Sequence, residues 1–443
     1  MKKFCKENGS VNLAVLIIIA IVIICLAVVM IKMVSSTARS GDSDIQRSTN
    51  DNPDEKPEEP EEDPIEDIDY NSEDFSYEFL KMESKEKKGT NTIYSPLSIK
   101  YALCLLDEGA DGKTKEEIDN ILGDSKLTKY KNVNKVMSLA NAVWIKENFK
   151  HKVLDSYNKT LVDKYDAEIQ YDEFKSAKNI NKWISKKTFG IINDFLSDDS
   201  VQDDSLSMFL INALAIDMEW DSSFSTNDTY SGVFDKDGNN LKVAYMNKSN
   251  IYEDSISYKI DDDVTVLAMD LKEYDGVQLE FDAIMPNEEL LEDFITNLDS
   301  QKIDNYLSNL TIASEVEEGV NVKVPKFDFD YSIMLKKELI AMGMKSAFIS
   351  DADFSKITGE KNLYVSDAIH KADIEFSEEG IRAAAVTTFK INSLSAPIKE
   401  KQEVNIDKPF MFVIRDKETG EVWFVGSVYN PVLWEDVRDK YNK

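Results

Sequence analysis

The amino-acid sequence predicts an α+β fold, and three observations along the chain point to it. Apolar residues recur at three- and four-residue spacing in LSIKYALCLLDEG (97–109) and KNINKWISKKTFGIINDFL (178–196), which indicates amphipathic helices. The later segment PFMFVIRDKETGEVWFVGSVYNP (409–431) has two apolar runs around a short turn, which predicts a β-hairpin. Residues 71–443 contain no internal repeat and no low-complexity break, so we expect them to form one domain.

The N-terminal part of the chain is almost wholly apolar and carries no charge over residues 11–31. At a helical rise of about 1.5 Å per residue this stretch spans roughly 30 Å, the thickness of a bilayer's hydrocarbon core. Because lysines precede it and acidic residues follow it, we expect a transmembrane signal-anchor at 11–33 behind a short cytoplasmic N-terminus at 1–10. The domain would then face the exterior of the cell membrane; cleavage near Ala38, which would secrete it, is the alternative.

The segment 34–70 is rich in Asp, Glu, Pro and Ser, as in DNPDEKPEEPEEDPIED. Such a composition buries too little apolar surface to offset the entropy of ordering, so we expect a disordered acidic linker. The whole chain has 83 acidic and 52 basic residues and a formal charge of -31. A surface of this sign repels a phosphate backbone, so we expect no nucleic-acid partner.

Several local patterns resemble binding or catalytic motifs but lack required parts. GADGKT (109–114) has two residues where a phosphate loop needs four, and DKDG (235–238) lacks the later ligands of a calcium loop and predicts a hairpin turn. The chain has two histidines, and no Gly-x-Ser-x-Gly, His-Glu-x-x-His or Cys-x-x-Cys motif. We therefore predict no enzyme, no cofactor and no metal site, with His151 at the surface and His370 hydrogen-bonded in a core strand.

A series of short motifs follows one order along the domain. They are NTIYSPLSI (91–99), NAVW (141–144), Asn212 with Trp220, VPKF (324–327), Gly343-Met344, ADFS (352–355), SDAIHK (366–371), EEGIRAAAVTT (378–388), and Pro409-Phe410 to Asn430-Pro431. In this order and spacing the chain resembles the serpin family of serine protease inhibitors. The resemblance covers the whole domain and implies three β-sheets, about nine helices and an exposed reactive loop after Gly380.

The resemblance also implies a mechanism. In that family the protease cleaves the reactive loop and becomes acylated, and the loop then inserts as a new strand of the largest sheet and distorts the protease before the ester hydrolyses. We therefore expect a monomeric suicide-substrate inhibitor that forms a covalent acyl complex with an extracellular serine protease. A non-inhibitory serpin that acts as a surface carrier or binding module is the nearest alternative, and a tethered surface hydrolase or binding domain is the alternative from another class.

The residues at the start of the loop suit insertion into a sheet. Alternate side chains of a strand face the same side, and those that would face inward are uncharged, namely Ile381, Ala383, Ala385 and Thr387. An alanine-rich helix is the plain alternative for this run. The resemblance assigns the hinge to Glu378, Glu379, Gly380, Ile381, Arg382, Ala383, Ala384, Ala385, Val386 and Thr387.

The bait bond is placed by counting the family's usual fourteen residues from Gly380, which gives Leu394-Ser395. This spacing resembles antichymotrypsin-type members, which also carry Leu-Ser here; a bond a few residues later, at 396–398, is the alternative. A leucine before the cleaved bond fits a hydrophobic primary pocket, as in chymotrypsin-like or subtilisin-like proteases.

The resemblance further assigns residues to the opening of the sheet. Ser95, Ser98, Asn212 and His370 would form a buried polar shutter between central strands, although plain hydrogen-bond satisfaction in the core is an alternative role. Trp220 would lie at the breach, where the loop first enters the sheet.

Overall fold

The fold is described from a computed structural model, which covers residues 65, 67–124, 127–193, 195–201, 208–361, 363–366, 368–381 and 401–441. The chain divides into two compact units, Met1–Asp63 and Pro64–Lys443, and all described residues belong to the second. The anchor expected at 11–33 lies outside the described residues. Of the helices that are described, none has the length and apolar character needed to cross a membrane.

The prediction of an α+β fold is confirmed, with ten α-helices in the described ranges against about nine expected. The helices are α2 (Phe75–Glu86), α3 (Pro96–Gly109), α4 (Gly112–Leu122), α5 (Asp155–Tyr165), α6 (Lys178–Lys187), α7 (Leu291–Thr296), α8 (Ser300–Tyr306), α9 (Leu335–Ala341), α10 (Ser355–Thr358) and α11 (Trp434–Tyr441). Short 3-10 helices lie at Ser72–Asp74, Glu147–Phe149, Asp199–Val201, Thr226–Asp228, Ala313–Glu315 and Ser346–Phe348.

The strands form four hydrogen-bonded groups in the described part of the chain. The seven-stranded sheet runs β1 (Thr92–Tyr94), β18 (Val422–Val428), β17 (Phe410–Asp416), β10 (Leu279–Pro286), β9 (Val264–Asp270), β8 (Ile256–Ile260) and β11 (Thr311–Ile312). A four-stranded sheet runs β16 (Gln402–Asn405), β12 (Val320–Pro325), β7 (Asn239–Ile251) and β6 (Thr229–Lys236). The remaining groups are β13 (Phe327–Met334), β14 (Ile369–Phe376), β15 (Gly380–Ile381) and β5 (Met218–Glu219), and β3 (Glu168–Asp172), β2 (Met137–Lys146) and β4 (Met208–Ile216).

Two predicted elements form where their sequence signals place them. α3 begins after Ser95, whose hydroxyl oxygen accepts the Ser98 N–H at 3.1 Å, and Pro96 occupies the first turn, where a missing N–H costs nothing. β17 and β18 pair antiparallel around a turn in which Gly420 has a φ of 73°, a left-handed angle that glycine adopts without strain. The helix and the C-terminal hairpin are therefore confirmed.

The second predicted helix is shorter than its pattern indicates. α6 ends at Lys187, and the prediction of helix from 188 to 196 is wrong for the described residues of that stretch. The Thr188 hydroxyl donates to the Ile184 carbonyl oxygen at 2.9 Å, and Phe189 and Gly190 follow with φ angles of 58° and 80°. A right-handed helix cannot continue through residues in the left-handed conformation. The apolar residues beyond this point therefore lie in turns that pack on the core.

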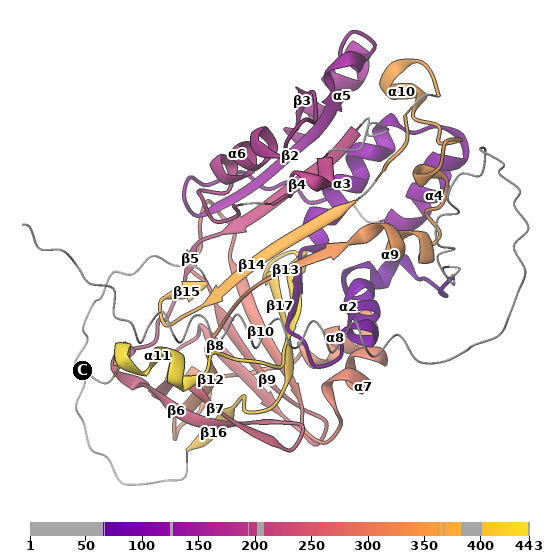
Figure 1. The fold of residues 1–443 in the computed structure, drawn as a ribbon. Helices are drawn as coiled ribbons and strands as arrows, with labels where there is room; N and C mark the ends of the chain where they lie inside the picture. The colour runs from indigo at the N-terminus through magenta and orange to yellow at the C-terminus, as the bar shows by residue number, and fades with distance from the viewer. Residues whose placement is uncertain are drawn as a thin grey trace, which may run out of the picture. The chain divides into compact units, whose positions relative to one another are not determined.

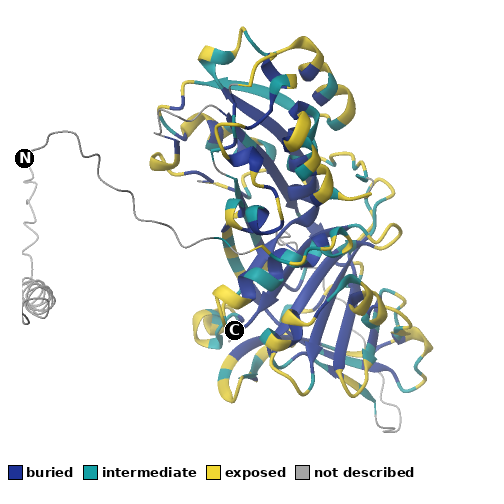
Figure 2. Cartoon of the chain, turned by 90° about the vertical axis from the view of Figure 1, so that its right-hand side faces the viewer, coloured by how far each residue is buried: buried dark blue, intermediate teal, exposed yellow. Residues whose placement is uncertain are grey.

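The strands β2 and β4 are covered on both faces. Trp144 of β2 packs in the cluster that contains Ile184 of α6, whereas its neighbour Val143 belongs to the cluster that contains Leu103 of α3. Figure 1 shows α6 on one side of these strands and α3 on the other, and α5 packs on the α3 side, where Tyr157 and Leu161 join the cluster of Leu103. Figure 2 shows the buried residues concentrated in the strands and the exposed ones in loops and on the outer sides of helices.

The two smaller groups of strands are parts of one interrupted sheet. β5 follows β4 after a single residue, and β4 and β14 lie next to each other in Figure 1 and make contacts. No backbone pair joins β4 to β14 in the residues that the structure describes, whereas β15 pairs with both β5 and β14. The sheet therefore has a gap between β4 and β14 that is filled by β15 at one end only. With this interrupted sheet the described strands make the three sheets that were expected.

Candidate functional site

The site is the end of the gap where the chain leaves β14, turns, and returns as β15. Ile381 pairs with Phe376 on one side and with Met218 on the other, and Gly380 pairs with Glu219. The Ile381 side chain is buried in the core, which is the inward orientation expected from strand alternation.

Gly380 is required by the close approach of β5. A Cβ atom at this position would collide with the carbonyl oxygen of Met218 and would lie 2.7 Å from the Cα of Glu219. Both are backbone atoms, which cannot move aside as a flexible side chain could. Only glycine lets β15 sit between β5 and β14 in this register.

The turn that precedes β15 is held by the segment after β5. The backbone N–H of Trp220 donates to the Glu379 carbonyl oxygen at 2.9 Å. The indole N–H of the same residue donates to the Ser377 carbonyl oxygen, also at 2.9 Å. The Phe224 N–H donates to the Glu378 carbonyl oxygen at 2.8 Å. The structure thus places Trp220 against the hinge turn, at the end of the gap, where the sequence predicted the breach.

Trp220 also packs against the aromatic core beneath the turn. Its ring lies edge-on to Phe376 with centroids 5.2 Å apart and to Phe281 with centroids 6.0 Å apart. The indole is 1% exposed. Its N–H must therefore find a protein acceptor, which the Ser377 carbonyl supplies.

Glu378 makes a buried ion pair with Lys326. The Lys326 ammonium donates to Oε2 of Glu378, while Oε1 accepts hydrogen bonds from the Thr229 hydroxyl and the Tyr441 hydroxyl, each at 2.7 Å. Burial acts to raise the pKa of Glu378, but the Lys326 charge and these hydrogen bonds outweigh it and lower that pKa to about 2. The carboxylate is therefore ionised at neutral pH and fully bonded.

The four predicted shutter residues come together beneath the gap. The Ser95 N–H donates to Nε2 of His370 at 3.0 Å, which links α3 to β14. The Ser98 hydroxyl donates to Oδ1 of Asn212, which links α3 to β4. The Asn212 amide in turn donates to Oδ1 of Asn141 on β2. These contacts join both sides of the gap to α3. If β4 and β14 moved apart, the hydrogen bonds that Ser95 and Ser98 of this region make to His370 and Asn212 would have to change.

His370 is held in its neutral form by this arrangement. It is buried, and burial lowers its pKa to about 4. Nε2 accepts the Ser95 N–H and therefore carries no proton, so the ring proton lies on Nδ1. The predictions that His370 lies in a core strand and that His151 is exposed are both confirmed.

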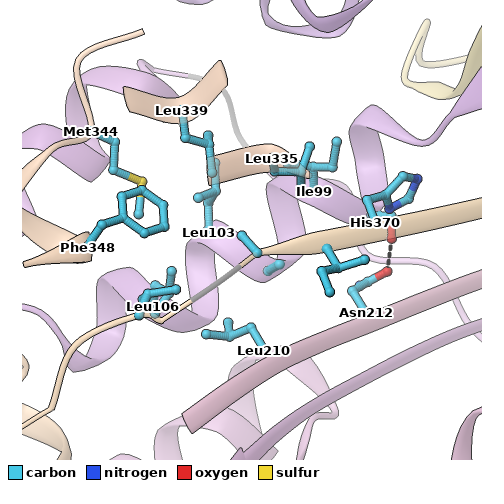
Figure 3. A pocket seen from close by; sticks show the side chains of 15 residues that line it. Ile99, Leu103, Leu106, Leu210, Asn212, Leu335, Leu339, Met344, Phe348 and His370 are labelled. Carbon is cyan, nitrogen blue, oxygen red and sulfur yellow. Dashed lines mark hydrogen bonds between the residues drawn. The ribbon is translucent and has the colours of Figure 1, made fainter. Parts of the chain in front are cut away.

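A small cavity of about 40 Å³ lies under the gap beside these residues. Figure 3 shows Asn212 and His370 at one end of it and the apolar side chains of Leu103, Leu106 and Phe348 at the other. The lining of the cavity is mostly apolar, and its volume is far below the roughly 300–1,000 Å³ of a small-molecule site. It offers room for side chains to rearrange rather than for a substrate.

Part of the predicted site lies outside the described residues. This part is the later hinge, Arg382, Ala383, Ala384, Ala385, Val386 and Thr387, together with the bait bond Leu394-Ser395. The described hinge residues are Glu378, Glu379, Gly380 and Ile381, and they lie together at the end of the gap.

Sequence reasoning missed three residues that complete these clusters. Asn141 lies opposite Asn212 in the β2–β4 register, and Thr229 and Tyr441 bond the Glu378 carboxylate. The motif NAVW contained Asn141 and could have indicated it. No sequence signal marked Thr229 or Tyr441, because their partner is more than sixty residues away in each case.

One cluster of carboxylates elsewhere has metal-like spacing. Oxygens of Glu83, Glu86 and Glu338 lie within 4.8 Å of one another. Lys87 and Lys337 form ion pairs with Glu83 and Glu86 and already neutralise those charges. Burial raises the pKa of Glu338, which favours its neutral form. We assign no metal to this cluster.

Comparisons with known proteins agree with this geometry. A family model described as "Serpin (serine protease inhibitor)" matches residues 70–431. The chain is 31% identical over 373 residues to an uncharacterized serpin-like protein of Thermococcus kodakarensis, covering 78% of this chain and 83% of that protein. It is 27% identical over 379 residues to alpha-1-antichymotrypsin of Homo sapiens, covering 81% and 86%.

Solved structures give the same result. The native state of the thermophilic serpin tengpin superposes with a TM-score of 0.68 at 29% identity, covering 83% of this chain and 97% of that one. The family model spans most of the domain, and it describes serine protease inhibitors rather than enzymes, as do the names of relatives such as alpha-1-antichymotrypsin. The chain belongs to the serpin family.

Proposed function

We propose that this serpin is a suicide-substrate inhibitor of serine proteases that have a hydrophobic primary pocket, either chymotrypsin-like or subtilisin-like. The observation that carries the proposal is the position of Gly380 and Ile381 between β14 and β5, directly above the unpaired stretch of β4 and β14. The facing edges of these strands carry backbone donors and acceptors that a new strand would satisfy. A loop that starts here needs only to be cut to continue into the gap.

The bait bond proposed for this loop is Leu394-Ser395. The bond lies outside the described residues, and the proposal rests on the fourteen-residue spacing from Gly380 and on the fit of leucine to an apolar pocket. Mass spectrometry of the small fragment released by a chymotrypsin-like protease tests it. We expect Ser395 as the first residue of the fragment; a fragment that begins after 396 would move the bait bond.

We further propose that residues 11–33 anchor the protein in the cell membrane, with the serpin domain outside. The uncharged apolar stretch and the lysines before it support this topology. The test is whether the full chain stays in the membrane fraction after an alkaline wash while added protease degrades the domain on intact cells. Release of the domain into the medium would favour cleavage near Ala38.

The inhibitory mechanism is tested with a matched pair of hinge variants. The inward alternation that begins at buried Ile381 would continue at Ala383 and not at Ala384. We expect wild type to form a covalent complex with chymotrypsin that survives boiling in detergent. Ala383→Arg should abolish the complex while cleavage continues, because insertion would bury a charge, whereas Ala384→Arg should keep it.

The contrary outcomes are equally clear. Cleavage of wild type with no covalent species would sink the inhibitory mechanism and favour the non-inhibitory alternative. If Ala383→Arg and Ala384→Arg changed complex formation equally, insertion of the loop would not determine whether the covalent complex forms. Leu394→Asp should abolish complex formation with chymotrypsin while the unfolding transition stays unchanged, since the change removes only the fit to the pocket.

A further inference from the structure

The C-terminal helix α11 lies beyond the residues that the family model matches, yet it reaches the loop hinge. The match ends at residue 431, and α11 runs from Trp434 to Tyr441. The connecting residues cross the four-stranded sheet: the Ala244 N–H donates to the Val432 carbonyl oxygen at 3.0 Å, and the Val432 N–H donates to the Lys326 carbonyl oxygen at 2.8 Å. α11 thus rests beside β6 and β7, close to β15 (Figure 1).

The hydroxyl of Tyr441 lies within the Lys326–Glu378 ion pair. It donates to Oε1 of Glu378 at 2.7 Å and is 2.8 Å from the Lys326 ammonium, which donates to it. A phenol hydroxyl has one proton to donate and lone pairs to accept, so it can bond both charged partners at once. The ring is 5.5 Å from the Lys326 ammonium and stacks on Trp434 with centroids 6.0 Å apart, which fixes its position.

The contacts of Glu378 tie the hinge turn to the four-stranded sheet. Thr229 is the first residue of β6, and Tyr441 belongs to the helix that rests on β6 and β7. Glu378 itself lies two residues before Gly380, in the turn that continues β14. Widening of the gap at its β5 end would pull this turn away from Thr229 and Tyr441, leaving a buried carboxylate short of donors, which is costly.

We propose that Tyr441 is a positioning residue of the loop hinge: acting through Glu378, it holds the turn 377–379 against the four-stranded sheet and keeps the gap closed until the loop is cut. The proposal rests on the proposed function in that the gap is taken as the place of insertion. The contact itself can be tested without any protease.

The test measures how fast the intact domain takes up a synthetic peptide with the sequence of residues 381–394, followed by native gel electrophoresis. Tyr441→Phe keeps the ring and its stacking on Trp434 but loses both hydrogen bonds. We expect uptake to be roughly tenfold faster, the effect of removing a hydrogen bond to a buried charge. Arg438→Ala, at an exposed position of the same helix, should leave the rate unchanged.

A double-variant cycle separates positioning from plain stabilisation of the C-terminus. If Tyr441 acts through Glu378, then Tyr441→Phe should have little further effect on uptake in a Glu378→Gln background. An unchanged rate in Tyr441→Phe, or the same acceleration in both backgrounds, would overturn the proposal. Absence of uptake by every variant would also overturn it, because the gap would then accept no strand.

The outcomes for the two proposals are distinguishable. If wild type fails to trap chymotrypsin but Tyr441→Phe still speeds peptide uptake, the inhibitory function fails and the role of Tyr441 stands. If wild type traps chymotrypsin and Tyr441→Phe leaves the rate of peptide uptake unchanged, the inhibitory function stands and the role of Tyr441 fails.

Discussion

At the scale of single residues, His370 makes stability depend on pH. Burial lowers its pKa from 6.5 to about 4 in the folded protein. As pH falls through this window the unfolded chain binds a proton at His370 that the native state excludes, so the contribution of His370 to the free energy of unfolding should decrease by about 3 kcal/mol between pH 6.5 and 4. Asp270, whose pKa is raised to about 6, acts in the opposite direction in this window, so the loss is read as the difference between wild type and a His370 variant. Urea denaturation at pH 7.0, 5.5 and 4.5 measures the loss.

The second histidine supplies the control for this prediction. His370→Gln retains a carbonyl oxygen that can accept the Ser95 N–H and has no proton to gain, so its stability should vary less with pH. His151→Gln, at an exposed position, should behave as wild type. Equal pH slopes for wild type and His370→Gln would contradict the assignment. The contribution of Glu378 is lost mainly between its unfolded pKa of 4.5 and its folded pKa of about 2, and it is the same in wild type and His370→Gln, so it cancels in the comparison.

At the scale of elements, β15 depends on the glycine at its start. Gly380→Ala would place a Cβ against the backbone of β5, and neither strand can yield without losing its pairing. We expect a loss of about 1–3 kcal/mol in the free energy of unfolding, as for other overpacked sites. Hydrogen exchange should also speed up at the Ile381 amide, which lies in the displaced strand. Unchanged stability and unchanged exchange would show that β5 and β15 do not approach this closely.

The sequence predicted those elements whose signals are local. The helix at 97–109 and the hairpin at 409–431 carry their own caps, spacing and turn residues, and both form. The helix predicted beyond Lys187 fails because apolar spacing does not reveal the left-handed residues Phe189 and Gly190. Element type is thus better encoded locally than element length.

The candidate site was predictable only in part, for a related reason. The family motifs carried Asn212, His370 and Glu378, which the structure brings to the gap. Their partners come from other strands and from the C-terminal helix, and such pairings depend on register and topology. Asn141 faces Asn212 only once β2 and β4 are aligned, and Tyr441 sits in a polar stretch with no motif.

At the scale of the whole molecule, the proposed function requires that the uncut chain is not in its most stable arrangement, and the interrupted sheet fits this requirement. β4 and β14 lie side by side without a shared ladder, and the hinge already occupies one end of the space between them. Under the proposed mechanism, cutting the loop would free the residues after Ile381 to extend β15. Each inserted residue would pair with both neighbours and would bury alternate uncharged side chains.

We therefore expect a single cut between residues 388 and 398 to raise the midpoint of thermal unfolding by about 10 °C or more, the shift that several kcal/mol produce in a domain of this size. Calorimetry of intact and nicked protein at one scan rate measures it, since unfolding of such a chain can be irreversible. Ala383→Arg provides the control: its nicked form should melt near the intact temperature, because the buried arginine opposes insertion. If nicked wild type melts at no higher temperature than the intact protein, the cut loop does not insert as a new strand between β4 and β14. The domain would then bind its partners without loop insertion.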